Sequence, residues 1–232
     1  MNGKKGRIFI YLSDIRPLYK EELQNAVYQS LPEIRQKKAD ACRSGQPRAA
    51  SLAAGFLAQY ALEQYALEQH ALERDDQGYE IFYEQSGAPR VQAPEGAPNV
   101  YISLSHSGDC AVCALCAQPV GIDIQQEKPI KTGMLRHFLT AEEKEFFFKR
   151  FQMTGAEREL PADAENAFLK DWTAKESYMK LTGQGMSMGF SALTVDWDTG
   201  WIWEKKAPHK RAQLIALEAP KGYFMTACRP GE

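Results

Sequence analysis

The sequence predicts an α+β fold of two pseudo-symmetric subdomains, each an antiparallel sheet packed with helices, with the active site in the cleft between them. Strands, helices and a returning pair of strands follow one another twice along the 232 residues. The pair Gln118-Pro119 separates the two runs. We therefore expect an N-terminal half over 1–117 and a C-terminal half over 118–232, a length that suits two small domains.

Composition favours a globular protein without a nucleic-acid or membrane partner. Hydrophobic residues make up 44% of the chain and charged residues 25%, and the formal net charge is −2. No apolar run approaches the roughly 20 residues of a membrane span. The N-terminal stretch MNGKKGRIFIYLSD has no signal-peptide pattern. We expect a cytoplasmic protein.

The five cysteines fit reduced thiols, because their number is odd and no secretion signal accompanies them. Cys110, Cys113 and Cys116 form a CxxCxxC run that could suggest a metal cluster. Their segment is predicted to be a strand, in which residues i and i+3 point to opposite faces. This geometry argues against a shared metal.

The first half reads as a strand followed by helices. Residues 7–12 form the strand, residues 19–29 a helix, and a basic helical segment follows Leu31-Pro32-Glu33. Pro47 suits the start of a long helix that runs to about Arg74. Its ALEQY-ALEQH-ALER repeat rotates its leucines around the helix, which argues against a coiled coil.

A strand over 79–83 is followed by a Pro- and Gly-rich stretch over 86–99 that we expect to be a loop. Strands over 100–107 and 110–117 come next, with the turn at 107–109. In the first of them Val100, Ile102 and Leu104 alternate with polar or exposed positions. His106 lies at the strand end, where side chains often reach a site.

The second half opens with a strand that carries an unusual acid. In VGIDIQ, Asp123 shares a face with Gly121 and Gln125 on an otherwise apolar strand. Asp123 is either a functional acid or an Asp bonded to a neighbouring loop. A helical region over 131–151 follows, with a cap-like start at Thr140, and residues 152–166 are predicted to be irregular. Short antiparallel strands are expected over 192–197, 201–204, 212–217 and 223–228.

The segment FLKDWTAKESYMKLTGQG, residues 168–185, predicts a helix closed by glycines. At roughly 100° per residue, Phe168, Trp172 and Met179 form an apolar stripe, and Glu176 falls inside it. Burying a carboxylate is costly unless a cation or donors satisfy it. Lys180 lies one turn beyond Glu176, and Lys175 lies on the other side of the stripe. Glu176 is either functional or a capped surface acid.

Three features now follow in order: SHS at a strand end, VGID on a strand and WTAKESYMK on a helix. An Asp and a Glu from separate elements suit Mg²⁺, which typically takes one or two carboxylates together with substrate phosphates. A lysine beyond the Glu and a nearby histidine could contact phosphates. The residues therefore indicate Mg²⁺-assisted chemistry on a phosphate or pyrophosphate.

This combination resembles the Sfp-type 4′-phosphopantetheinyl transferase family. The sharp matches are SLSHS at 103–107, VGIDI at 120–124 and the helix at 168–185. The resemblance implies a monomer that binds coenzyme A in the cleft. It also implies Mg²⁺-dependent transfer of the phosphopantetheine arm to a serine of an apo acyl- or peptidyl-carrier protein, with release of 3′,5′-ADP.

The resemblance also implies roles for individual residues. Asp123 and Glu176 match the metal ligands, and Glu143 an acid that acts in the second shell or through water. Gln125 stands where many relatives carry a third acid, so its ligation of the metal is in doubt. Glu176, directly or through water, is the expected base, and Lys180 assists the leaving phosphate. The expected coenzyme A contacts are His106, Ser105, Lys175, Lys180, Arg48, Lys37 and Lys38, with Arg90 substituting for a lysine that relatives carry at Ala88.

Two other functions fit the same residues: a Mg²⁺-dependent hydrolase of coenzyme A or a nucleotide pyrophosphate, and a non-catalytic relative that binds coenzyme A. The phenylalanines over 146–151 are either an apolar surface for the carrier protein or part of the core, and we favour the core.

Overall fold

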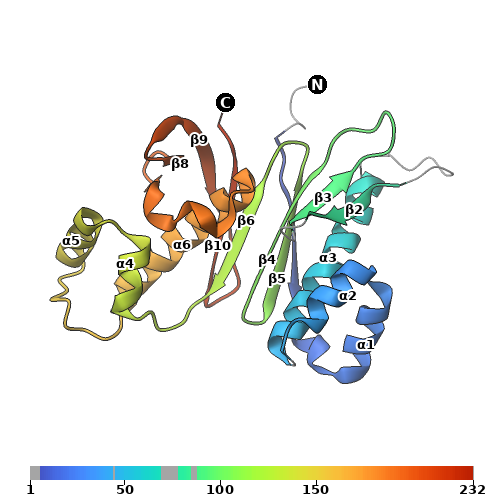
Figure 1. Ribbon diagram of the computed structural model, residues 1–232, viewed down its shortest axis with the longest axis horizontal. Coiled ribbons are helices and arrows are strands. Elements are labelled where there is room, and N and C mark those ends of the chain that lie inside the picture. Colours follow the sequence, from blue (N-terminus) through green and yellow to red (C-terminus); the bar gives the residue numbers. More distant parts are fainter. Residues whose placement is uncertain (1–5, 44, 69–77, 85–87, 232) are drawn as a thin grey trace. The chain divides into compact units, whose positions relative to one another are not determined.

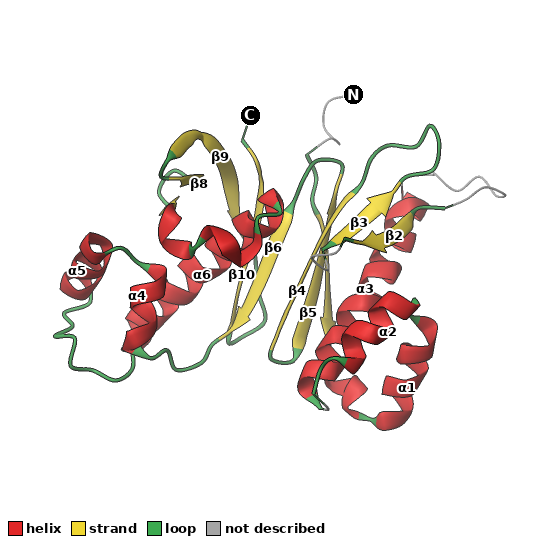
Figure 2. Ribbon diagram, in the orientation of Figure 1, coloured by secondary structure: helices red, strands yellow, loops and turns green. Residues whose placement is uncertain are grey.

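The computed structural model describes residues 6–43, 45–68, 78–84 and 88–231 (Figure 1). The chain divides into two compact units, Met1–Ile124 (unit 1) and Gln125–Glu232 (unit 2). Figure 2 shows that each unit contains both helices and strands. The α+β class with two units is therefore confirmed. The pseudo-symmetry, the cleft and the half boundary after Ala117 stay predictions.

Unit 1 is built on a three-stranded antiparallel sheet of order β1-β5-β4. Its strands are β1 (Phe9–Asp14), β4 (Tyr101–Ser107) and β5 (Cys110–Cys116). In the register Ile102 pairs with Leu115 and Leu104 with Cys113, so these side chains share one face. That face packs against the long helix α3 (Gln46–Glu68), which supplies alanines and leucines to the same core. The predicted end of this helix near Arg74 lies outside the described residues.

Two shorter helices, α1 (Glu21–Ser30) and α2 (Glu33–Asp40), pack against α3, and a 3-10 turn η1 (Arg16–Tyr19) precedes them. The strand β2 (Glu80–Tyr83) forms a hairpin with β3 (Pro89–Gln92). The prediction of a loop over 86–99 is therefore wrong for residues 89–92. Arg90 and Val91 pair with Phe82 and Ile81. Proline is tolerated at a strand's first residue, which is where Pro89 lies.

The cysteine-rich segment is a strand, as predicted, and its three cysteines are buried free thiols. Cys113 faces the α3 core, whereas Cys110 and Cys116 belong to the opposite face of β5. Burial raises the pKa of the Cys113 thiol well above its usual range. A thiol in this state is an inert core group.

Gly55 on α3 allows α2 to approach closely. A Cβ at this position would lie 2.8 Å from Nε of Arg35 and 3.2 Å from Cδ1 of Leu31. Arg35 itself is buried: its guanidinium donates to the Ser51 carbonyl and lies 5.2 Å from the centroid of the Tyr83 ring. The guanidinium therefore has little room to move.

We expect Gly55→Ala to lower the free energy of unfolding by about 1–2 kcal/mol, because overpacking outweighs the gain in helix propensity. Urea denaturation measures the change. Gly133→Ala is the control, since no heavy atom lies within 4 Å of its added Cβ. An unchanged or higher denaturation midpoint for Gly55→Ala would show that Arg35 and Leu31 can shift at no cost.

Unit 2 centres on an antiparallel sheet covered by one long helix. The strand order is β6-β10-β9-β8-β7, and β6 crosses the boundary between the units. The strands are β6 (Gly121–Gln126), β7 (Leu193–Asp196), β8 (Trp201–Glu204), β9 (Ala207–Ala216) and β10 (Tyr223–Pro230). The helix α6 (Ala162–Thr182) packs along β10, where the hydroxyls of Thr173 and Thr226 lie 2.8 Å apart.

The remaining helical pieces are short. The predicted helical region over 131–151 is interrupted, and consists of η2 (Thr132–Met134), α4 (Leu135–Phe138) and α5 (Ala141–Arg150). The predicted cap at Thr140 is confirmed as a capping box with Glu143. Two 3-10 turns, η3 (Gly185–Met188) and η4 (Phe190–Ala192), follow α6.

The prediction that residues 152–166 are irregular is wrong from Ala162 onward, because α6 begins there, six residues before its expected start. Asp163 and Glu165 lie in its first turn, where acidic side chains interact favourably with the helix dipole. The helix ends at Thr182, and Gly183 caps it with a φ of 69°. The glycine stop was therefore placed correctly.

Across the described ranges, none of the helices combines the length and the apolar character that crossing a bilayer requires.

Candidate active site

Asp123 lies in the buried part of β6 and is only 5% exposed. The hydroxyl of Ser105, on β4, donates to Oδ1 of Asp123 over 2.6 Å. Two residues earlier on β4, Oγ of Ser103 accepts from the backbone N–H of Ile122 at 3.1 Å. The structure thus brings together Ser105 and Asp123 among the predicted site residues. It also adds Ser103, which the sequence analysis did not single out.

The polar positions of β4 divide between two faces. Ile102 and Leu104 alternate with the polar Ser103 and Ser105, as predicted, but both serines are buried as well. His106 is exposed and pairs with Ala111 on the face that Ile102 and Leu104 share. Because successive strand residues point to opposite faces, Ser105 and His106 project in opposite directions.

Glu176 and Lys180 lie one turn apart on α6, and both are half-buried. The sequence analysis placed the Glu176 carboxylate in a buried stripe. That prediction of burial is wrong, because the side chain is only half-buried. The buried charged residue is its neighbour Lys175, which is 3% exposed. The helix packs both on the sheet and on the α4 side, so its buried arc is wider than one apolar stripe.

Lys175 is enclosed by groups of unit 2. Its Nζ lies 4.1 Å from the centroid of the Phe138 ring and 3.4 Å from the Phe138 carbonyl oxygen, to which it donates. Burial lowers the pKa of Lys175 to about 8, while the carboxylates of Glu143 and Asp171 act in the opposite direction. Its predicted contact with coenzyme A stays a prediction.

Both oxygens of Glu143 have partners within unit 2. Oε2 accepts from the Thr140 backbone N–H at 2.8 Å, and Oε1 forms an ion pair with Nζ of Lys205 at 2.7 Å. Burial would raise the pKa of Glu143, but the Lys205 ammonium and the Thr140 N–H outweigh it and keep that pKa below its usual range. Direct metal ligation by Glu143 would require one of these contacts to be exchanged.

Two of the predicted coenzyme A contacts in unit 1, Lys37 and Arg90, form ion pairs with glutamates nearby in the sequence. Lys37 pairs with Glu33 at 2.6 Å, and Arg90 pairs with Glu84 at 2.8 Å. Exposed pairs of this kind contribute little to stability, so a phosphate could replace the carboxylate. Lys38 is exposed as a residue, yet partial burial near Arg35 lowers its pKa.

Arg48 is held more firmly. Its guanidinium pairs with Asp40 at 2.8 Å and donates to Gln24 at 3.2 Å. It also lies 5.0 Å from the centroid of the Tyr28 ring.

Gln125, at the end of β6, donates through Nε2 to the Gln126 carbonyl at 3.2 Å.

The carboxylates among the candidate residues suit a hard cation that also takes waters and substrate phosphates as ligands. Within the part of the chain that the structure describes, no group of three or more His, Cys, Asp or Glu side chains could hold a metal. Mg²⁺ needs only one or two carboxylates beside waters and substrate phosphates. Asp123 is buried and Glu176 is half-buried, and the prediction that they hold a metal stays a prediction.

These elements match a known class of protein. Residues 119–228 match the model of the 4′-phosphopantetheinyl transferase superfamily. The matched stretch contains β6 with Asp123, and α6 with Glu176 and Lys180.

Curated proteins that are similar to the chain are named 4′-phosphopantetheinyl transferases. The chain is 37% identical to the 4′-phosphopantetheinyl transferase psf-1 of Bacillus pumilus over 112 residues, 48% of this chain and 42% of the relative. It is 28% identical to a 4′-phosphopantetheinyl transferase of Bacillus subtilis over 156 residues, 66% and 64% of the two chains. It is 27% identical to the 4′-phosphopantetheinyl transferase Sfp of Bacillus subtilis strain 168 over 133 residues, 56% and 55%. The chain thus spans about half the length of these relatives.

Proposed function

We propose that this protein transfers the 4′-phosphopantetheine arm of coenzyme A to a serine of an apo acyl- or peptidyl-carrier protein, with Mg²⁺, releasing 3′,5′-ADP. The observation that carries the proposal is that the superfamily match covers both elements with the candidate carboxylates. The names of the relatives support the same reaction.

In the proposed reaction the serine oxygen of the carrier attacks the β-phosphorus of coenzyme A. The bond from that phosphorus to the bridging oxygen breaks, and 3′,5′-ADP leaves. Glu176 accepts the serine proton, directly or through a water. Lys180 and His106 contact phosphate oxygens and offset their charge.

Asp123 and Glu176 would hold the Mg²⁺, with water or Gln125 completing its ligands. When bound, the ion neutralises charge that develops on the pyrophosphate. Because both Glu143 oxygens have partners, we assign Glu143 an indirect role, through a water or through Lys205. The predicted coenzyme A contacts of Ser105, Lys175, Lys37, Lys38, Arg48 and Arg90 are retained as proposals.

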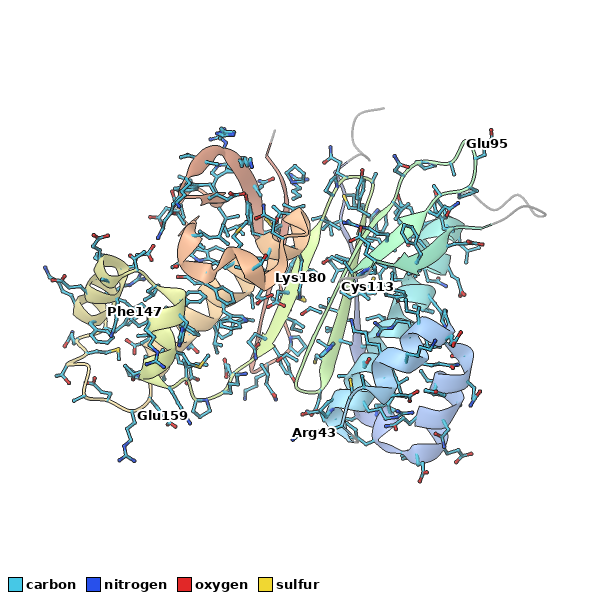
Figure 3. All side chains as sticks on the ribbon, in the orientation of Figure 1. Arg43, Glu95, Cys113, Phe147, Glu159 and Lys180 are labelled. Atoms are coloured by element: carbon cyan, nitrogen blue, oxygen red, sulfur yellow. The ribbon has the colours of Figure 1, made fainter. Side chains whose placement is uncertain are left out.

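Three of the phenylalanines over 146–151 belong to the core, since Phe147, Phe148 and Phe151 pack against the buried cluster of unit 2. Phe146 is 67% exposed and remains a candidate contact for the carrier. Figure 3 shows Phe147 on α5 and Lys180 on α6 at opposite ends of unit 2. A carrier that contacts α5 would therefore extend along this unit to bring its serine to α6.

The test is to incubate the protein with coenzyme A, Mg²⁺ and several apo-carriers, and to measure intact carrier mass together with released 3′,5′-ADP. We expect one phosphopantetheine per carrier and an equal amount of 3′,5′-ADP. Cleavage of coenzyme A without carrier modification would favour the hydrolase. Binding of coenzyme A without any turnover would favour the non-catalytic relative.

A further inference from the structure

One face of β4 carries two buried serines, which form hydrogen bonds with two successive residues of β6. Ser103 and Ser105 are 5% and 7% exposed and share one face of the strand. Oγ of Ser103 accepts from the Ile122 backbone, and Oγ of Ser105 donates to the Asp123 side chain. One serine thus fixes the main chain of β6, and the other fixes the adjacent carboxylate.

This arrangement has a physical reason in the sheet topology. β4 is an edge strand in the order β1-β5-β4. Its serine hydroxyls are buried, and a buried hydroxyl is costly unless it is hydrogen-bonded. The two contacts satisfy that requirement while tying β4 to β6.

The Ser105–Asp123 contact has the geometry of a strong, charge-assisted hydrogen bond. Its 2.6 Å length lies in the range of about 2.5–2.7 Å that is usual for O–H···O⁻ bonds. The terminal torsion of an Asp side chain is broad, so an unconstrained carboxylate rotates easily. A short bond to one oxygen restricts that rotation.

We propose that Ser105 is a positioning residue: through its bond to Oδ1 it holds the Asp123 carboxylate in the orientation that receives the divalent cation. Ser103 stabilises the same strand but does not orient the ligand. The inference rests on the proposed function, because it takes Asp123 as a ligand of the cation. It adds a second role to the coenzyme A contact that the family resemblance implies for Ser105.

The expected effect is on cation affinity. Groups that orient metal ligands typically contribute 10–100-fold in metal affinity or activity. Removal of the Ser105 hydroxyl should therefore raise the Kd for the cation by about 10- to 100-fold. The Mg²⁺ concentration for half-maximal carrier modification should rise in parallel, while kcat at saturating Mg²⁺ recovers most of its wild-type value.

The experiment compares Ser105→Ala, Ser105→Thr and Ser103→Ala with the wild-type protein. Mn²⁺ is titrated in the presence of coenzyme A, and free Mn²⁺ is measured by electron paramagnetic resonance. Ser105→Thr keeps the hydroxyl and should retain the wild-type Kd within about 2-fold. Ser103→Ala should lower the denaturation midpoint but also keep the Kd within about 2-fold.

Ser105→Cys covers the case in which Ser105→Ala does not fold. It keeps the side-chain volume but has a weak S–H donor, so it should also weaken Mn²⁺ binding. Wild-type Mn²⁺ affinity in a folded Ser105→Ala or Ser105→Cys protein overturns the proposal. Equal weakening by Ser103→Ala also overturns it, since the effect would then come from β6 as a whole.

The outcomes also separate this inference from the proposed function. If the wild-type protein modifies carriers and binds Mn²⁺, and the Ser105 variants behave in the same way, only the positioning role of Ser105 is overturned. If the wild-type protein neither modifies a carrier nor binds Mn²⁺, the positioning role and the proposed function are both overturned.

Discussion

Glu176→Gln is expected to lower kcat/KM for carrier modification by about 10²- to 10⁴-fold, the range usual for a lost general base. Glutamine keeps the size of the side chain but cannot accept the serine proton, and its neutral amide is a weaker ligand for Mg²⁺. Glu176 is half-buried, one turn before Lys180 on a helix whose Gly183 cap fixes its end. The substitution should therefore leave the fold unchanged.

The measurement is the initial rate of phosphopantetheine transfer at several Mg²⁺ concentrations. Asp163→Asn is the matched control, since Asp163 is an exposed acid on the same helix and its side chain accepts from the adjacent Ala164 N–H. It should keep wild-type rates. Full activity of Glu176→Gln at saturating Mg²⁺ would remove Glu176 from both assigned roles and leave Asp123 as the remaining candidate carboxylate.

The same helix shows what periodicity can and cannot predict. The apolar spacing and the glycines located α6 and its C-terminal end, because those signals are local. The burial of Lys175 was not predictable, since it depends on the ring and carbonyl of Phe138, 37 residues earlier in the chain. A pattern that counts lysine as polar places it outside the core.

The hairpin of β2 and β3 shows a related limit. Proline and glycine predicted a loop over 86–99, of which residues 86 and 87 lie outside the described residues. Arg90 and Val91 instead form a strand, because β2 lies alongside. Short strands take their stability from a partner rather than from their own propensity. Composition alone could not separate residues 89–92 from the loop around them.

For the candidate site, sequence motifs indicated the residue types but not their contacts. Asp123 stood out because an acid on an apolar strand needs an explanation. Its partner Ser105 lies 18 residues away, and the bond between them depends on how β4 approaches β6. The regular placement of serines in SLSHS is a signal that could have been used, because buried strand serines must find partners.

The second large effect is expected in the core of unit 2, where Phe138→Ala should lower the free energy of unfolding by about 3–5 kcal/mol. Phe138 is 1% exposed on the four-residue helix α4. Its ring centroid lies 4.6 Å from that of Phe168 and 5.1 Å from that of Phe190, and it stacks on Trp172 at 5.9 Å. Truncation removes these contacts and leaves a cavity. It also removes the ring under the Lys175 ammonium, which lies 4.1 Å from its centroid.

Chemical denaturation followed by tryptophan fluorescence measures the loss, because Trp172 reports on the same cluster. Phe146→Ala is the matched control: it deletes the same group from α5, where the side chain is 67% exposed, and should change stability by no more than about 0.5 kcal/mol. A loss of 3–5 kcal/mol is a large part of the roughly 5–15 kcal/mol that stabilises a typical domain. Equal effects of the two substitutions would mean that α4 does not close the core of unit 2, and that Lys175 is accessible to a phosphate after all.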